Sequence, residues 1–220
     1  MFLNVNNSID IKKNNMRFRD FQIYAKNLPA FNLNDVRKFD PDFHRQQLND
    51  WLDRGYILSL AGGFYMLADT QVDESYLFML VNRIYEPSYI SRESALAYYL
   101  VIPETVLGVT SVSSRKTKQF DSKWGRFSYH SIKPVLMFGY QVVKHDKMIK
   151  YKIASLEKAV LDYLYWNKRI DSMDDFAGLR WNRQELSGLE DNPLFKKYLK
   201  VFDSKALERR VDLLKEYIHA

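Results

Sequence analysis

The side chains best suited to specific hydrogen bonding in this sequence are Arg45, Gln46 and Asn49, which fall within one segment, 41–54. On double-stranded DNA an arginine can donate two hydrogen bonds to a guanine, and glutamine or asparagine can pair with an adenine. Separations of one and four residues place all three on one face of a helix. The same face carries three carboxylates that would repel phosphates, Asp42, Asp50 and Asp53. The pattern is therefore typical of base recognition or, alternatively, of a protein-docking helix with solvated polar side chains.

The residue types of a catalytic or metal-binding site are present in the sequence but are not arranged as one. The histidines are His44, His130, His145 and His219, and no two of them have metal-ligand spacing. No glycine-rich phosphate loop and no G-x-S-x-G elbow occurs. The adjacent carboxylates at 174–175 and 190–191 stand where helix caps are expected. We therefore expect no enzymatic activity, no cofactor and no metal; the alternative, a transferase acting on RNA or nucleotide, would need a carboxylate pair that holds a metal.

The composition is that of a globular protein. The chain has 220 residues, of which 46% are hydrophobic and 27% charged, and it has no cysteine, which suits a reducing compartment. The longest apolar run, 95–102, is far shorter than the ~20 residues that span a bilayer. The first residues lack the features of a signal peptide. The sequence therefore predicts a soluble, cytoplasmic protein with no membrane partner.

The positive charge is concentrated in the middle of the chain. The formal net charge is +6, and residues 71–169 hold fifteen basic against nine acidic residues. Five of these basic residues form a candidate basic patch: Arg115, Lys116, Lys118, Lys123 and Arg126. The basic patch is either a solvated, lysine-rich hairpin or a surface that faces phosphates.

The first 70 residues divide into two parts. Residues 1–15 lack periodicity and are expected to form a flexible leader. Within 16–70, apolar spacing and capping residues predict three helices followed by two strands. The expected helices cover 17–28, 32–39 with Asn32 as cap, and 41–54 with Asp40 as cap and Pro41 in the first turn; the strands cover 56–60 and 64–67. This order is typical of a winged helix-turn-helix domain, which lays its third helix in the major groove of DNA.

Other residues of this domain are expected to contact the DNA backbone. Arg37 and Lys38 lie near the second helix, and the wing between the two strands contributes Ser59, Gly62 and Gly63. Nine basic and eight acidic residues leave the first 70 residues almost neutral. A second copy in a dimer, or basic residues elsewhere, would then have to supply the attraction to phosphates. The oligomeric state, monomer or dimer on DNA, stays open.

Residues 71–220 are expected to form a second domain, a mixed β-sheet with surrounding helices, which gives the chain an α/β (α+β) class. Helices are expected at 75–85, from Ser91 as cap to the residues before Pro103, and after Ser155 as cap. Strands are expected at 106–113, 126–132, 139–144 and 148–153, with a turn at 145–147. Residues 170–220 are expected to be all-helical.

Three segments, in order along the chain, match the motifs of one known protein family. They are 48–65, LNDWLDRGYILSLAGGFY; 88–96, SYISRESAL; and 153–162, IASLEKAVLD. The first is similar to the end of the winged helix in the AbiEi family of type IV antitoxins, and the other two resemble two motifs further along that family's sequences. The motif positions with polar side chains are Ser91, Ser94, Glu157, Lys158 and Asp162. The residues of the second and third motifs could be helix caps, core and a structural ion network rather than a functional surface.

The resemblance implies a bacterial antitoxin that also represses its own operon and takes part in abortive infection, a defence against phage. The N-terminal winged helix would bind operator DNA. The C-terminal domain would counteract a nucleotidyltransferase-like toxin, AbiEii, without an assumed stable contact between the two proteins. The alternative from the residues alone is a winged-helix interaction module with no specific DNA binding.

Overall fold

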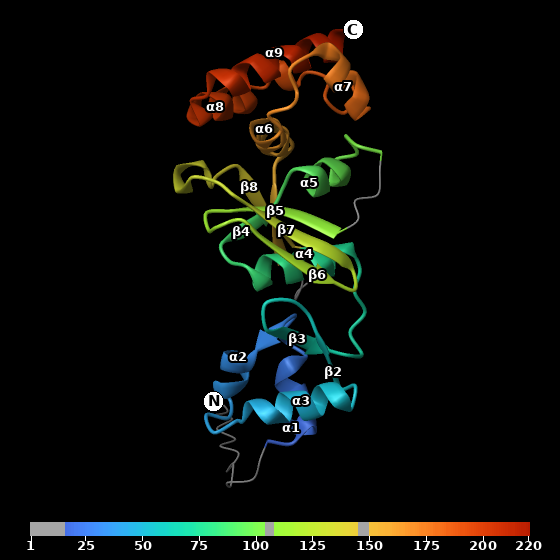
Figure 1. Ribbon diagram of the computed structural model, residues 1–220, viewed down its shortest axis with the longest axis vertical. Coiled ribbons are helices and arrows are strands. Elements are labelled where there is room, and N and C mark those ends of the chain that lie inside the picture. The colour runs from blue at the N-terminus through green and yellow to red at the C-terminus, as the bar shows by residue number, and fades with distance from the viewer. Residues whose placement is uncertain (1–15, 104–107, 145–149) are drawn as a thin grey trace, which may run out of the picture. The chain divides into compact units, whose positions relative to one another are not determined.

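The computed structural model describes residues 16–103, 108–144 and 150–220, so the expected leader at 1–15 and the expected turn at 145–147 lie outside the described residues. Its class is mixed α/β, as the sequence predicts (Figure 1). The described chain forms two compact units. The first contains residues up to Ser59 together with Gly63–Thr70, and the second contains Leu60–Gly62 and Gln71–Ala220.

The first unit contains three short helices and a small antiparallel sheet. Its elements are α1 (Phe18–Ala25), β1 (Phe31–Asn32), α2 (Leu33–Arg37), α3 (Arg45–Asp53), β2 (Ile57–Ser59) and β3 (Phe64–Leu67). The strand order is β1-β3-β2. Strands β2 and β3 form the expected hairpin, with Ile57 opposite Leu67 and Ser59 opposite Tyr65. Strand β1, which the sequence did not predict, adds a third strand beside β3.

The start of α2 was predicted correctly, whereas the start of α3 was not. The Asn32 side chain caps α2 by accepting the N–H groups of Asn34 and Asp35, at 2.8 and 3.1 Å. Asp40 does not cap α3: its carboxylate accepts the N–H of Asp42 at 3.2 Å and closes a turn instead. Helix α3 begins four residues later than expected, after His44, whose N–H donates to a glutamine side chain one turn into the helix.

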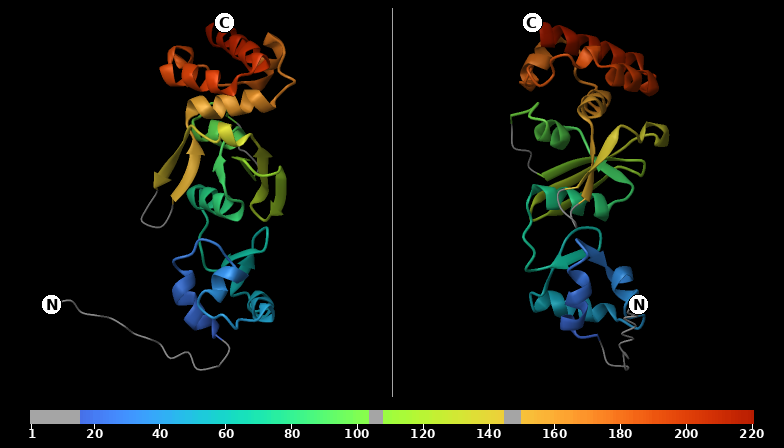
Figure 2. Two further views of the ribbon diagram at one scale, coloured as in Figure 1. Left: turned by 90° about the vertical axis from the view of Figure 1, so that its left-hand side faces the viewer. Right: turned by 180° about the vertical axis from the view of Figure 1, so that it is seen from behind.

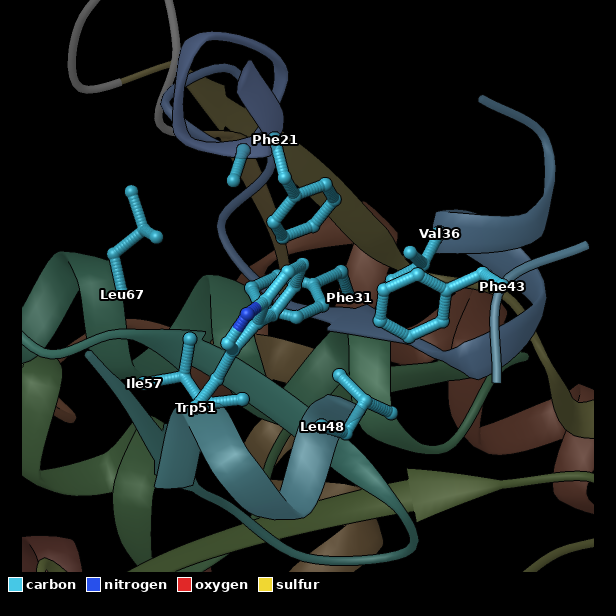
Figure 3. Close-up of a cluster of buried hydrophobic side chains, with 9 residues drawn as sticks. Phe21, Phe31, Val36, Phe43, Leu48, Trp51, Ile57 and Leu67 are labelled. Atoms are coloured by element: carbon cyan, nitrogen blue, oxygen red, sulfur yellow. The ribbon is translucent and has the colours of Figure 1, made fainter. Parts of the chain in front are cut away.

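The core of the first unit is aromatic and is centred on Trp51 (Figure 3). The Trp51 ring stacks on Phe21, with centroids 5.2 Å apart, and contacts the rings of Phe18 and Phe43 at 5.3 and 5.1 Å. Leu48, one turn earlier on α3, is also buried. Because both core residues of α3 lie on one side, its opposite side is left for solvent.

The second unit is built on a six-stranded mixed sheet with the order β6-β7-β5-β4-β9-β8. Its strands are β4 (Ser88–Ile90), β5 (Gly108–Ser113), β6 (Lys118–Ser122), β7 (Gly125–Ser131), β8 (Tyr140–Lys144) and β9 (Lys150–Ala154). Pairs β5–β7 and β4–β9 are parallel and the other pairs are antiparallel. Strands β4 and β6 were not predicted from the sequence.

The helices of the second unit are α4 (Glu74–Ile84), α5 (Glu93–Tyr98), α6 (Leu156–Trp166), α7 (Met173–Leu179), α8 (Pro193–Phe202) and α9 (Lys205–His219), with the short turns η1 (Pro134–Leu136) and η2 (Leu189–Asp191). Helix α4 covers one face of the sheet, and α5 and α6 cover the other (Figure 2). Helices α8 and α9 pack on α6, and α7 packs on α9. The segment after 170 therefore forms a second layer over α6.

Two serines of the second unit, Ser91 and Ser155, were predicted to cap helices, and the prediction is correct for one of them. Ser155 caps α6, because its side chain accepts the N–H of Lys158 at 3.4 Å. Ser91 does not cap α5, which follows Arg92 and ends at Tyr98, well before Pro103. The Ser91 hydroxyl donates to Asp162 instead, at 2.8 Å. A capping pattern in the sequence was thus overridden by a buried partner far along the chain.

Candidate functional site

The structure brings the three predicted base-reading residues together on the solvent side of α3. Arg45, Gln46 and Asn49 are all exposed, whereas Leu48 and Trp51 fill the core on the opposite side. The exposed face thus offers a guanidinium and two amides within the first five residues of the helix. In helix-turn-helix proteins it is the N-terminal part of the recognition helix that meets base edges.

The aspartates on α3 are confined to its C-terminal half. Asp50 follows Gln46 by four residues, and Asp53 follows Asn49 by four residues, so each carboxylate lies one turn beyond an amide. Both carboxylates are exposed. The face is therefore polarised along the helix axis, with hydrogen-bond donors first and negative charge last.

Arg37 and Lys38, the expected backbone contacts, are exposed but engaged within the first unit. The Arg37 Nε donates to the carbonyl of Phe43 at 3.2 Å, which holds the turn before α3. The Lys38 ammonium pairs with Asp35 at 2.9 Å. Their contribution to a phosphate surface is thus reduced by these intramolecular contacts.

The wing residues lie around the β2–β3 turn. Ser59, Gly62 and Gly63 are exposed, and both glycines have positive φ, +63° and +80°. The turn therefore requires residues that tolerate the left-handed region. Of the wing residues, Ser59 and Gly63 are assigned to the first unit and Gly62 to the second.

The basic patch follows the β6–β7 hairpin of the second unit. All five of its members are exposed. Lys118 lies on β6, and Lys123 lies in the hairpin turn with its ammonium 4.4 Å from the Trp124 ring. Arg126 pairs with Asp121 at 2.8 Å. Within the basic patch, the lysines are therefore more available than Arg126 to contact a phosphate.

Arg115 is held differently from the rest of the basic patch. Its guanidinium lies 4.1 Å from the centre of the Tyr85 ring and donates to the carbonyl of Glu86 at 3.1 Å. Stacking on an aromatic face and a backbone acceptor fix its orientation. Lys116 contributes its carbonyl to the same region by accepting the hydroxyl of Tyr85 at 2.8 Å.

Three of the family-motif residues converge in a buried polar cluster together with Tyr89. Asp162 forms an ion pair with Lys158 and accepts the hydroxyls of Tyr89, at 2.9 Å, and Ser91, at 2.8 Å. The Lys158 ammonium also donates to the Tyr89 oxygen at 2.8 Å. All four side chains are fully buried. The sequence indicated Ser91, Lys158 and Asp162 but not Tyr89, although Tyr89 is part of the same SYIS motif.

Burial dominates the electrostatics of this cluster. It raises the pKa of Tyr89, and the Asp162 carboxylate adds to that effect. It lowers the pKa of the Lys158 ammonium, while Asp162 opposes the shift. The bonds of Lys158 and Asp162 to Tyr89 join α6 to β4. Since neither side chain reaches the surface, a partner protein cannot contact them.

The other two motif residues serve separate contacts. Ser94 and Thr110 bond each other twice, with Ser94 N–H to the Thr110 hydroxyl at 3.0 Å and Thr110 N–H to the Ser94 hydroxyl at 2.8 Å. Glu157 accepts the side-chain amide of Asn192 at 2.7 Å. The polar residues of the second and third motifs are therefore engaged in contacts within the second unit.

Within the described ranges, no group of three or more histidine, aspartate or glutamate side chains is placed to hold a metal ion. Ser172 caps α7, and the Asp175 carboxylate completes the capping box by accepting the N–H of Ser172 at 2.9 Å. Glu190 lies 2.6 Å from the His219 ring. No helix among the described residues is long and apolar enough to cross a membrane. No family model and no curated protein matches the chain.

Proposed function

We propose that this chain is an antitoxin and autorepressor of a bacterial type IV toxin–antitoxin operon involved in abortive infection and phage defence. Its first unit binds operator DNA, and its second unit counteracts a nucleotidyltransferase-like toxin without enzymatic activity, cofactor or metal. The observation that carries the proposal is the exposed N-terminal half of α3, where Arg45, Gln46 and Asn49 stand together. The three ordered sequence segments that resemble the AbiEi family support it.

The element order of the first unit also supports DNA binding. A helix, a short strand, two helices and a hairpin follow one another, and β3 lies between β1 and β2. A winged helix has this order and presents its third helix to the major groove. Because this unit is nearly neutral, a second bound copy or the basic patch supplies the salt-sensitive part of the affinity.

Fluorescence anisotropy of the full chain with the DNA upstream of its own gene tests the proposal. A scrambled duplex serves as competitor across a salt series. We expect a preference of ~10³-fold or more for the upstream DNA and an affinity that falls as salt rises. The Arg45→Ala, Gln46→Ala, Asn49→Ala variant loses the preference, since each base contact is worth about 1–3 kcal/mol.

The matched control replaces two exposed polar residues of the first unit outside α3, Arg19 and Lys26, by alanine. This variant should keep the preference for the upstream DNA. If Arg19 or Lys26 contacts a phosphate, the affinity for both duplexes falls equally and the preference is unchanged. Equal, weak binding of the unsubstituted chain to both duplexes contradicts an operator-binding function.

A second candidate function is protein docking through the same helix. The exposed carboxylates Asp50 and Asp53 favour it, since they repel phosphates and attract a basic partner. This function predicts no salt-sensitive DNA binding and a stable complex with a protein in pull-down, which Asp50→Asn with Asp53→Asn would weaken.

The antitoxin activity has its own test. Co-expression of the full chain with the product of an adjacent toxin gene should restore growth, and the α3 alanine variant should restore it equally well. Loss of rescue in that variant would place toxin neutralisation in the first unit rather than in the second.

A further inference from the structure

The second unit contains a pocket that neither the sequence motifs nor the proposed DNA-binding surface uses. It has a volume of about 800 Å³ and lies among the end of β7, the turn η1, the C-terminal end of α6 and the start of α9. This volume lies within the range of small-molecule sites in proteins. Its lining includes Lys133, Tyr165, Trp166, Lys168, Ser204 and Arg210.

The described residues that line the pocket carry positive charge and include no carboxylate. Lys133, Lys168 and Arg210 are its charged lining residues. In the part of the chain that the structure describes, none of the three forms an ion pair. The Arg210 guanidinium is held in place by donating to the carbonyl of Leu164 at 3.3 Å. Three unpaired cations around one concave surface favour an anion, and a phosphate above all.

The start of α9 adds to this positive potential. Ser204 caps the helix by accepting the N–H of Leu207 at 3.3 Å, and Ser204 and Ala206 both line the pocket. The helix is 15 residues long, with one acidic residue, Glu208, in its first turn, and the partial positive charge of its N-terminus lies at Ser204 and Ala206. The helix terminus thus reinforces what the two lysines and the arginine already provide.

Two aromatic side chains give the pocket a second kind of contact. Tyr165 and Trp166 belong to its lining, and the Trp166 ring also contacts His130, with ring centroids 5.5 Å apart. Among the described residues the Trp166 indole N–H has no hydrogen-bond acceptor. A planar ring of a ligand can stack on such side chains. We propose that this pocket binds a nucleoside phosphate, with Lys133, Lys168 and Arg210 on the phosphates and Tyr165 and Trp166 beside the base.

Isothermal titration calorimetry of the full chain tests this assignment, which does not depend on DNA binding by α3. The probes are ATP, GTP, UTP and inorganic tripolyphosphate. We expect at least one nucleotide to bind saturably, with one molecule per chain. Its affinity should exceed that of tripolyphosphate by about 10-fold or more, because stacking of the base adds to the phosphate contacts. Lys133→Glu and Lys168→Glu should each weaken nucleotide binding about 10-fold or more.

The matched control is Lys197→Glu, which makes the same charge change at an exposed position of α8 outside the pocket. It should leave the affinity unchanged. Trp166→Leu should weaken the binding of the nucleotide but not that of tripolyphosphate. Trp166→Phe should retain most of the nucleotide affinity. Circular dichroism verifies that each variant is folded. The assignment is overturned if no nucleotide binds saturably, if tripolyphosphate binds as tightly as the nucleotides, or if Lys197→Glu weakens binding as much as Lys133→Glu.

Discussion

Lys158 and Asp162 stand one helical turn apart on α6 and form an ion pair from which solvent is fully excluded. The hydroxyls of Tyr89, on β4, and Ser91, directly after it, also donate hydrogen bonds to the Asp162 carboxylate. The ammonium lies 4.8 and 5.1 Å from the ring centres of Phe202 and Phe138. The pair therefore ties together a strand in the middle of the sheet, the helix on its face and the helical layer beyond.

Lys158→Met should be strongly destabilising, by about 3–5 kcal/mol, because it leaves the Asp162 carboxylate buried without its cation. The loss is measured as a reduced free energy of unfolding in urea. The double variant Lys158→Met, Asp162→Leu should recover a large part of it, since no buried charge remains.

An exposed pair of similar spacing provides the comparison. Lys215 and Asp212 on α9 lie 2.7 Å apart with both side chains well exposed. Lys215→Met should cost no more than about 0.5 kcal/mol. Similar losses from Lys158→Met and Lys215→Met would contradict the role given to the buried pair.

Gly139→Ala should destabilise the second unit more than alanine at another glycine of the same backbone conformation. Gly139 has φ +70°, and a Cβ there would lie 2.8 Å from the Tyr198 ring and 3.0 Å from the Lys158 side chain. Gly188 has φ +74° with open space around it. Thermal unfolding should show a loss of about 1–2 kcal/mol for Gly188→Ala, from backbone strain, and about 2–4 kcal/mol for Gly139→Ala. Equal losses would mean that the neighbours of Gly139 move aside freely.

His130 should make the stability of the second unit sensitive to mild acid. Burial, with the nearby positive charge of Arg92, lowers the pKa of His130 to about 4. The unfolded chain takes up this proton near pH 6.5, so the free energy of unfolding falls as the pH drops from about 6.5 to about 4.

The loss in the free energy of unfolding due to His130 should be about 1–2 kcal/mol. This is less than the whole pKa shift of His130 implies, because the ring is partly exposed and solvent screens its interactions. Urea unfolding at several pH values should show a shallower fall for His130→Gln than for the unsubstituted chain. An NMR titration of the ring with a midpoint near 6.5 would rule this explanation out.

The basic patch should reveal itself in the salt dependence of DNA binding rather than in sequence preference. Lys118→Glu with Lys123→Glu should reduce the slope of log affinity against log salt by about 0.9 for each phosphate that the variant no longer neutralises. Lys197→Glu with Lys200→Glu on α8 makes the same change of charge elsewhere. An unchanged slope in the first variant would remove the basic patch from the interface.

Local patterns in the sequence predicted the first unit well and the second less well. The helix carrying Leu48 and Trp51 shows its apolar spacing openly, and a Gly-Gly turn marks the hairpin. Strand β6, KQFDS, was missed because four of its five residues are polar and its edge position leaves it largely exposed. The Asp40-Pro41 pair imitates a helix start, but the aspartate closes a turn instead.

Partners distant in the sequence explain the remaining differences. Ser91 resembles a cap because it precedes a helical pattern, yet its hydroxyl is taken by Asp162. The pocket between β7, η1, α6 and α9 draws Lys133, Lys168 and Arg210 from three separate parts of the chain, and no short motif contains them. The α3 face could be predicted because all its residues lie within five positions of one helix.

The parallel pairing of Ile90 with Ile153 at the centre of the sheet can form only after β9 has been synthesised. As the chain leaves the ribosome, the first unit has all its residues available long before β9 emerges. Strand β4 then has β5 on one side and an unpaired edge on the other, the kind of edge that invites association with other chains. We therefore expect the nascent protein to pass through a stage at which all residues of the first unit are present while the sheet of the second unit still has an unpaired edge at β4.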